Sequence, residues 1–117
     1  MQTPLQIAWH GVDKSDALEE DIRGKVQKLE EFCDHITSCR VVVEAPHRHH
    51  NKGNLYRLRI DITVPDREIV VTRDPGDKHA HEDIYVAVRD AFDAARRQLQ
   101  DYSRKRRGNV KHHDEAE

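Results

Sequence analysis

The sequence predicts an α+β domain with the element order β-α-β-β-β-α, and three observations support this fold class. Residues 56–64 alternate almost perfectly between apolar and polar side chains, which is the period of a strand with one buried face. In residues 18–29 and 84–102, apolar side chains recur every three or four positions, as in amphipathic helices. A chain of 117 residues has room for one domain of this size.

The first segment of the chain predicts a strand followed by a helix. Residues 5–9 alternate with the strand period, and Gly11 ends the run. Ser15 is a candidate N-cap, because its hydroxyl can accept a hydrogen bond from a free backbone N–H of the first turn. Asp16 and Glu19 would place negative charge at the positive end of the helix dipole, and the helix is expected to reach residue 32 or 33. The inward residues would be Leu5, Ile7 and Trp9 of the strand and Leu18, Ile22, Val26 and Leu29 of the helix.

The middle of the chain predicts three further strands. Residues 38–45 are expected to form a strand with one apolar face that Pro46 ends, and a polar loop follows at residues 46–54. Residues 56–64 and 68–73 are expected to pair as a hairpin, because Pro65 and Asp66 are typical turn residues. A break follows at residues 74–77. The side chains expected to face the core are Cys39, Val41, Val43, Tyr56, Leu58, Ile60, Ile62, Val64, Ile69 and Val71.

The second helix is expected from about residue 82 to residue 106. A strand-helix-strand unit favours a right-handed parallel crossover, so the four-stranded sheet would be mixed. Since the sheet has one apolar face, both helices must lie on that face and leave the other face in water. Residues 1–107 would form the domain, and residues 108–117 a polar, flexible tail. The buried stripe of the second helix would be Ile84, Val88, Ala91, Phe92, Ala95, Leu99 and Tyr102.

Charge is unevenly distributed along the chain. The net charge is -2, yet residues 89–107 carry seven basic side chains against three acidic ones, Asp90, Asp93 and Asp101. Because salt screens charges beyond about 10 Å, a local excess is enough to attract phosphate. At 100° per residue, five arginines of the second helix share one side, between about 80° and 180° from Val88. They are Arg89, Arg96, Arg97, Arg104 and Arg107.

Two helices packed side by side would combine these arginines with cations of the first helix. Such a stripe is suited to follow a phosphate backbone, with an affinity that falls steeply with salt. The alternative is an ordinary solvated face, since Asp93 lies four residues from both Arg89 and Arg97 and could pair with them. The candidate RNA-binding residues are Lys25, Lys28, Arg89, Arg96, Arg97, Arg104, Lys105 and Arg107.

Histidines form a second unusual feature of the sequence. The loop that contains His47, Arg48, His49, His50 and Lys52 could contact RNA, serve as a metal-binding or protein-interaction module, or be a plain polar loop. No carboxylate or thiol lies beside it at a ligand-like spacing, so neither a metal site nor a cofactor is expected. Cys33 and Cys39 match no common zinc or redox motif, and both thiols are expected to be reduced.

Several functional classes find no support in the sequence. It contains no Gly-rich phosphate loop, no Gly-x-Ser-x-Gly elbow and no His-Glu-x-x-His motif, so no enzymatic activity is expected. No apolar run approaches the roughly 20 residues that span a bilayer, and no signal peptide is recognisable. A cytoplasmic protein without a membrane partner is expected.

The second helix resembles a known family. Residues 81–99, His-Glu-Asp-Ile-Tyr-Val-Ala-Val-Arg-Asp-Ala-Phe-Asp-Ala-Ala-Arg-Arg-Gln-Leu, are similar to the signature of the ribosome hibernation promoting factor / ribosome-associated inhibitor A family, also called the sigma-54 modulation protein family. The likeness covers residues 4–107. The chain departs from the family at Ala94, where Lys is frequent. The matching positions are Asp83, Ile84, Tyr85, Ala87, Arg97, Gln98 and Leu99, with Lys25, Lys28, Leu29 and Glu30 in the first helix.

The resemblance implies a fold like a double-stranded-RNA-binding domain and a site on the small ribosomal subunit. The implied role is that of a hibernation factor, which contacts 16S-type rRNA near the tRNA and mRNA sites and blocks translation under stress. Such a protein acts by steric exclusion, needs no small-molecule substrate, and is expected here as a monomer. Residues 107–111, Arg-Gly-Asn-Val-Lys, are similar to those of a subgroup in which a cold-shock-like domain often follows.

Overall fold

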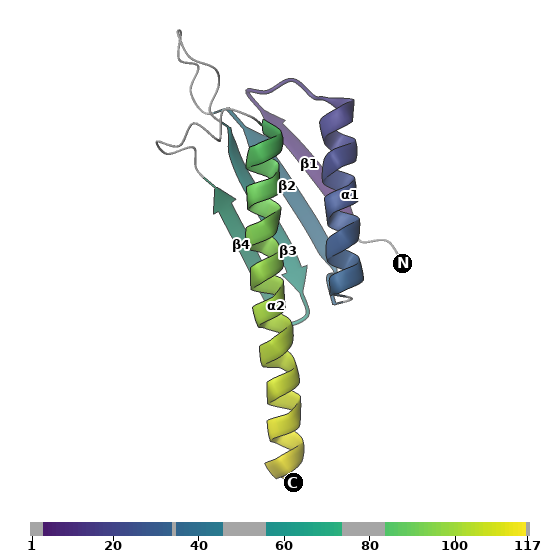
Figure 1. Ribbon diagram of the computed structural model, residues 1–117, viewed down its shortest axis with the longest axis vertical. Coiled ribbons are helices and arrows are strands. Elements are labelled where there is room, and N and C mark those ends of the chain that lie inside the picture. Colours follow the sequence, from purple (N-terminus) through teal and green to yellow (C-terminus); the bar gives the residue numbers. More distant parts are fainter. Residues whose placement is uncertain (1–3, 34, 46–55, 74–83, 117) are drawn as a thin grey trace.

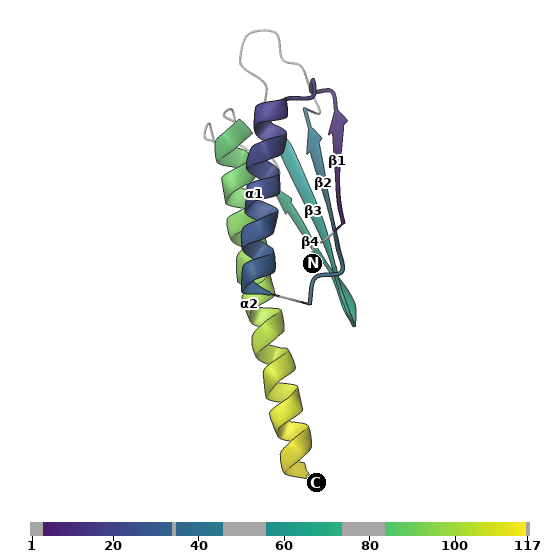
Figure 2. The same cartoon turned by 90° about the vertical axis from the view of Figure 1, so that its right-hand side faces the viewer.

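Two helices cover one face of a four-stranded sheet (Figures 1 and 2). The computed structural model describes residues 4–33, 35–45, 56–73 and 84–116, with side chains described as far as Arg106. The element order confirms the expected β-α-β-β-β-α arrangement. The elements are β1 (Leu5–His10), α1 (Asp16–Phe32), β2 (Ser38–Glu44), β3 (Arg57–Val64), β4 (Arg67–Arg73) and α2 (Ile84–Ala116).

The sheet is mixed and its strands lie in sequence order, β1-β2-β3-β4. β1 pairs with β2 in parallel, with α1 as the crossover, and the remaining pairs are antiparallel. In the central register Ile60 of β3 lies between Val41 of β2 and Val71 of β4. These three side chains are buried, so each strand turns the same face toward the helices. α2 packs over β3 and β4, and α1 lies beside it toward β1 (Figure 1).

Local chemistry explains where α1 begins and ends. The Ser15 hydroxyl accepts a hydrogen bond from the Leu18 N–H at 3.2 Å, which confirms the expected N-cap. Before it, Gly11 has a φ of 72°, and a Cβ there would lie 3.0 Å from the carbonyl oxygen of Ala45. A side chain at this position would therefore be strained and crowded, which accounts for glycine after β1. The last turn closes through the Cys33 N–H, which donates to the Leu29 carbonyl at 2.8 Å.

The core lies between the sheet and the two helices. Both predicted helix stripes are buried there, apart from Ile84, which is only partly buried. β1 is an edge strand, and its apolar side chains are likewise only partly buried. The largest fully buried side chains are Leu18, Ile22, Leu58, Ile60, Ile62, Leu99, Val41, Val43 and Val88.

The face of the sheet opposite the helices is less uniformly exposed to solvent than the alternation of side chains along the strands predicts. Val42 lies on that face, yet only 5% of its surface is exposed. Its cross-strand neighbours are Ala8 and Arg59, and an interior strand is flanked on both sides, so its central position is shielded. Val70, on the edge strand β4, is 40% exposed on the same face.

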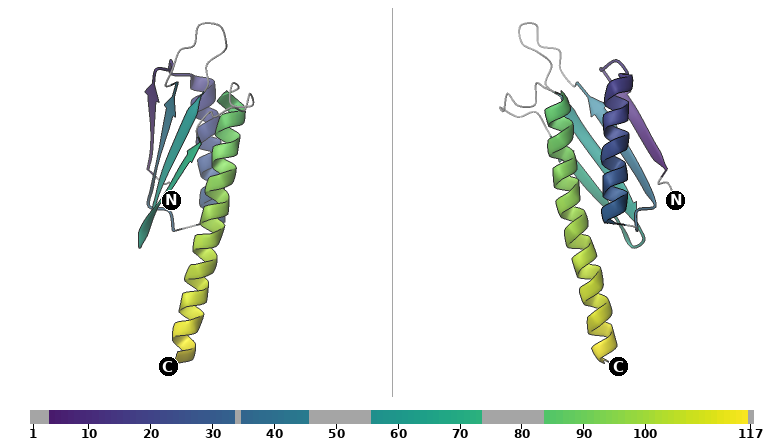
Figure 3. Two further views of the ribbon diagram at one scale, coloured as in Figure 1. Left: turned by 90° about the vertical axis from the view of Figure 1, so that its left-hand side faces the viewer. Right: turned by 45° about the vertical axis from the view of Figure 1, so that its right-hand side comes forward.

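The end of α2 differs from the expectation. The helix continues through Ala116 instead of ending near Arg106, and its last turns project beyond the sheet (Figure 3). Once a helix is nucleated, each added residue forms one further hydrogen bond, and only the two backbone dihedrals of that residue must be fixed. Gly108 opposes this extension by only about 1 kcal/mol, and no proline interrupts the segment. Flexibility of residues 108–117 stays a prediction.

Candidate nucleic-acid interface

α1 and α2 lie side by side and run in the same direction (Figures 1 and 3). Two contacts join them near the end of α1. The Ser103 hydroxyl donates to the sulfur of Cys33 at 3.8 Å. The guanidinium carbon of Arg96 lies 5.6 Å from the centre of the Phe32 ring, within the range of a cation–π interaction. The two helices therefore form one surface layer, as the cation stripe requires.

A pocket of about 260 Å³ lies at this junction. Its lining includes Lys28 from α1 and Arg96 from α2, two of the residues that the sequence assigned to RNA binding. Both side chains are exposed. Cations from the two helices are thus brought together at a single place. The other lining residues are Leu29, Glu31 and Phe32.

The remaining predicted arginines with described side chains lie on the outer side of α2. Arg89, Arg97 and Arg104 are exposed, whereas Val88 and Leu99 are buried against the sheet. Within the described part of the chain, no ion pair to a carboxylate is formed by Lys28, Arg96, Arg97 or Arg104. We name these four residues the outer cation surface. Their charges are not neutralised by described carboxylates, so they remain available to phosphate.

Three other predicted cations have carboxylate partners. Lys25 lies 3.4 Å from Asp21, and Lys105 lies 3.2 Å from Asp101. Arg89 lies 3.5 Å from Asp90, rather than pairing with Asp93 as the solvated-face alternative supposed. Ion pairs of this kind near the surface typically contribute 0 to about 1 kcal/mol, so exchanging their partner for phosphate costs little. These three cations remain predicted RNA-binding residues but are not counted in the outer cation surface.

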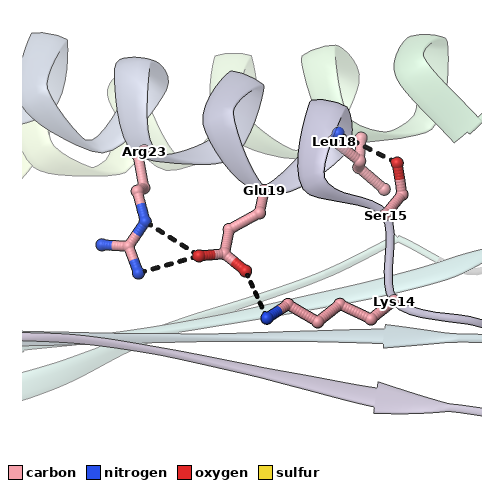
Figure 4. A network of polar contacts seen from close by, with 5 residues as sticks. All are labelled: Lys14, Ser15, Leu18, Glu19 and Arg23. Atoms are coloured by element: carbon pink, nitrogen blue, oxygen red, sulfur yellow. Dashed lines mark hydrogen bonds and ion pairs between the residues drawn. The ribbon is translucent and has the colours of Figure 1, made fainter.

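Cations on the far flank of α1 are occupied internally (Figure 4). The carboxylate of Glu19 accepts two hydrogen bonds from Arg23, at 3.1 and 3.0 Å, and lies 3.5 Å from the ammonium of Lys14. The hydrogen bond from Arg23 is the main cause that lowers the pKa of Glu19. This carboxylate is therefore ionised at neutral pH, and both cations have a carboxylate partner, as Lys25, Lys105 and Arg89 do.

The open sheet face shows a similar pairing. Arg59 donates to Asp61 at 3.0 Å, and this hydrogen bond raises the pKa of Arg59. Arg67, at the start of β4, lies on the helix-facing side instead: it is 3.7 Å from Asp66, and its guanidinium carbon is 5.5 Å from the centre of the Tyr102 ring of α2. Among the described residues, the open sheet face keeps Arg40 exposed and without an ion pair, whereas the helical face has the four cations of the outer cation surface.

The loop with His47, Arg48, His49, His50 and Lys52 lies outside the described residues, and so does the side chain of Arg107. Over the described ranges, no three His, Cys, Asp or Glu side chains are grouped to hold a metal ion. The role of the His-rich loop stays a prediction.

Two residues of this region were not singled out by the sequence reasoning. Phe32 was expected only as a possible helix end, but it lines the inter-helix pocket. Its signal was available, since it is a large apolar residue off the buried stripe of α1. Arg106 was counted in the basic run, but it turns back and donates to the Tyr102 hydroxyl at 3.0 Å. It therefore anchors α2 where the helix leaves the sheet.

The cysteines are free and buried, which confirms the expected reduced thiols. Burial raises the pKa of Cys39 to about 12, from an ordinary value of 9.0. A thiol that stays protonated at neutral pH is a poor nucleophile and a poor metal ligand. Cys39 is therefore a core residue and not part of a reactive site.

We expect alkaline pH to destabilise the fold through Cys39. Between about pH 9 and pH 12 the unfolded chain loses a proton that the folded chain keeps, so the free energy of unfolding falls as pH rises. The slope should approach roughly 1.4 kcal/mol per pH unit. Urea unfolding at pH 7, 9.5 and 10.5 measures it, and Cys39→Ala should show a shallower decline. Equal slopes for the variant and the wild type would contradict this assignment.

In the described ranges, no helix is both long and apolar enough to cross a membrane.

Two solved structures share this fold. A ribosomal subunit interface protein from Coxiella burnetii is 22% identical with a TM-score of 0.69, and the likeness covers 86% of this chain and 98% of that one. The N-terminal domain of Thermus thermophilus Protein Y is 17% identical with a TM-score of 0.66, over 86% of this chain and 99% of that one.

The family resemblance is confirmed, whereas a following cold-shock-like domain stays a prediction. No significant match was found among curated proteins. Residues 5–107 match the family described as sigma 54 modulation protein / S30EA ribosomal protein. Because this match spans nearly the whole chain and both helices that carry the signature, the chain belongs to the sigma 54 modulation protein / S30EA ribosomal protein family.

Proposed function

We propose that this protein is a ribosome-associated hibernation factor, which binds rRNA of the small subunit near the tRNA and mRNA sites and blocks translation under stress. The observation that carries the proposal is the outer cation surface, in which Lys28 of α1 meets Arg96 of α2 at one pocket. Membership of a family described as a ribosomal protein supports the ribosome as the partner. Its place of action would then be the cytoplasm, where it would bind as a monomer.

The physical basis of the proposal is contact with the phosphate backbone. Ribosomal RNA presents closely spaced phosphates, and each cation that contacts one releases condensed counterions. Arg97 and Arg104 lie seven residues apart, two helical turns, on the outer side of α2. They therefore extend the cationic surface beyond the pocket along the helix. Inhibition then needs no chemistry, because a bound domain excludes tRNA and mRNA from the space that it fills.

Sedimentation through sucrose gradients tests the proposal. The protein should co-sediment with small ribosomal subunits at 50 mM salt and dissociate progressively toward 300 mM. We assume that each of the four residues of the outer cation surface contacts one phosphate. A plot of the logarithm of the affinity against the logarithm of the salt concentration should then have a slope of about -3 or steeper. Added protein should also reduce translation in a cell-free reaction. Absence of ribosome association even at 50 mM salt would refute the proposed function.

A further inference from the structure

Phe32 is a large aromatic residue that the fold does not bury. Its exposed fraction is 38%, although its neighbours Leu29 and Cys33 are buried in the core. The core beneath the end of α1 is therefore filled without the ring. A cation–π contact at an exposed position adds little to folding, so the contact with Arg96 does not explain why an aromatic residue stands here. The packing of the core therefore does not require an aromatic ring at this position.

The pocket beside the ring has a defined size and chemistry. Its volume of about 260 Å³ lies just below the range of roughly 300–1,000 Å³ that encloses drug-sized ligands, so it suits one small planar group. The ring of Phe32 and the side chain of Leu29 supply apolar surface, and Lys28 and Arg96 supply positive charge. The carboxylate of Glu31 adds a hydrogen-bond acceptor. A planar aromatic group with an attached anion and amino donors fits all of these features.

We propose that this pocket receives one unpaired nucleobase of RNA, stacked on the Phe32–Arg96 pair, with its flanking phosphates held by Lys28 and Arg96. The inference rests on the proposed function and deepens it. Bases in single strands, loops and bulges expose a face that can stack on aromatic rings and guanidinium planes, whereas bases within a duplex do not. The outer cation surface would provide affinity for any RNA backbone, and the pocket would select a site with an accessible base.

The test uses the full-length chain and an RNA octamer that carries 2-aminopurine, a base whose fluorescence is quenched when it stacks. Wild-type protein should quench the probe on binding. Phe32→Leu, which keeps apolar bulk but removes the ring, should abolish the quenching and weaken binding roughly tenfold, as expected for loss of one stacking platform. Phe32→Tyr, which keeps the ring, should behave as the wild type.

Salt dependence separates stacking from charge. Phe32→Leu should lower the affinity by the same factor at all salt concentrations and leave the salt slope unchanged. Arg96→Gln should reduce the magnitude of that slope by about 0.7, since one phosphate contact to a single strand is lost. A purely structural role for Phe32 would instead lower the thermal midpoint of Phe32→Leu, so thermal melts of the variant accompany the salt titration.

Two further experiments use only the wild-type protein. A fully abasic octamer keeps its phosphates but lacks bases, so wild-type protein should bind it roughly tenfold more weakly than the 2-aminopurine octamer. Free adenosine monophosphate at the same concentration should not displace the octamer, because one phosphate provides too few contacts. Equal binding of the two octamers, or displacement by the free nucleotide, would overturn the inference.

Failure of the inference can be distinguished from failure of the proposed function. Suppose that Phe32→Leu binds small ribosomal subunits and quenches the octamer as the wild type does, and that replacement of Lys28 and Arg96 by Glu abolishes ribosome binding. The proposed function then stands, and the base pocket is refuted. If the wild-type protein binds neither ribosomes nor the octamer at 50 mM salt, both are refuted.

Discussion

Reversing the charge of Lys28, Arg96 and Arg97 to Glu should weaken binding to small ribosomal subunits about 1,000-fold or more. A hydrogen bond to a charged group contributes about 1.5–3 kcal/mol, and each 1.4 kcal/mol is a factor of about ten in affinity. Three lost contacts to phosphate therefore account for this factor before any repulsion is counted. Binding curves at several salt concentrations would measure both the affinity and the smaller salt slope of the variant.

A matched variant controls for the change in net charge. Arg23, Arg40 and Arg67 lie on the far flank of α1, the open sheet face and the start of β4, respectively. Their joint replacement by Glu changes the net charge equally but leaves the outer cation surface intact. This control should lose less than about tenfold in affinity, which is the effect of long-range attraction alone. Thermal melts would verify that both variants fold, and equal losses would show that binding depends on net charge rather than on one surface.

Replacing Ile60 by Ala should reduce the free energy of unfolding by about 2–5 kcal/mol. Ile60 is fully buried at the centre of β3, between Val41 and Val71. Small domains have total stabilities of only about 5–15 kcal/mol, so this one change removes a large fraction of the total. Urea denaturation followed by circular dichroism would measure the effect.

Val70→Ala provides the control for the core substitution. Val70 belongs to the adjacent strand β4 but faces away from the helices and is 40% exposed. Its truncation should cost less than about 1 kcal/mol, because it creates no cavity. Comparable losses at Ile60 and Val70 would mean that the buried layer does not lie between this sheet face and the helices.

The arrangement of helices and strands was predictable because its signals are local. Alternation through Leu58, Ile60 and Ile62 defined both the strand and its buried face, and Ser15 marked the start of α1. The same reasoning placed the end of α2 too early, because the local penalty of Gly108 is smaller than the gain from continuing a formed helix. It also missed the burial of Val42, which depends on neighbours from other strands.

The candidate site was predictable in composition but not in detail. Helical periodicity grouped Arg89, Arg96 and Arg97 on one side of α2, yet it did not reveal that Arg89 pairs with Asp90. Nor did it indicate that Phe32 of α1 would lie against Arg96, because their contact depends on how two distant segments pack. Patterns between neighbouring residues specify elements and faces, since backbone geometry repeats along the chain. The pocket arises from the packing of α1 against α2, which brings together Lys28, Phe32 and Arg96, residues that no sequence period connects.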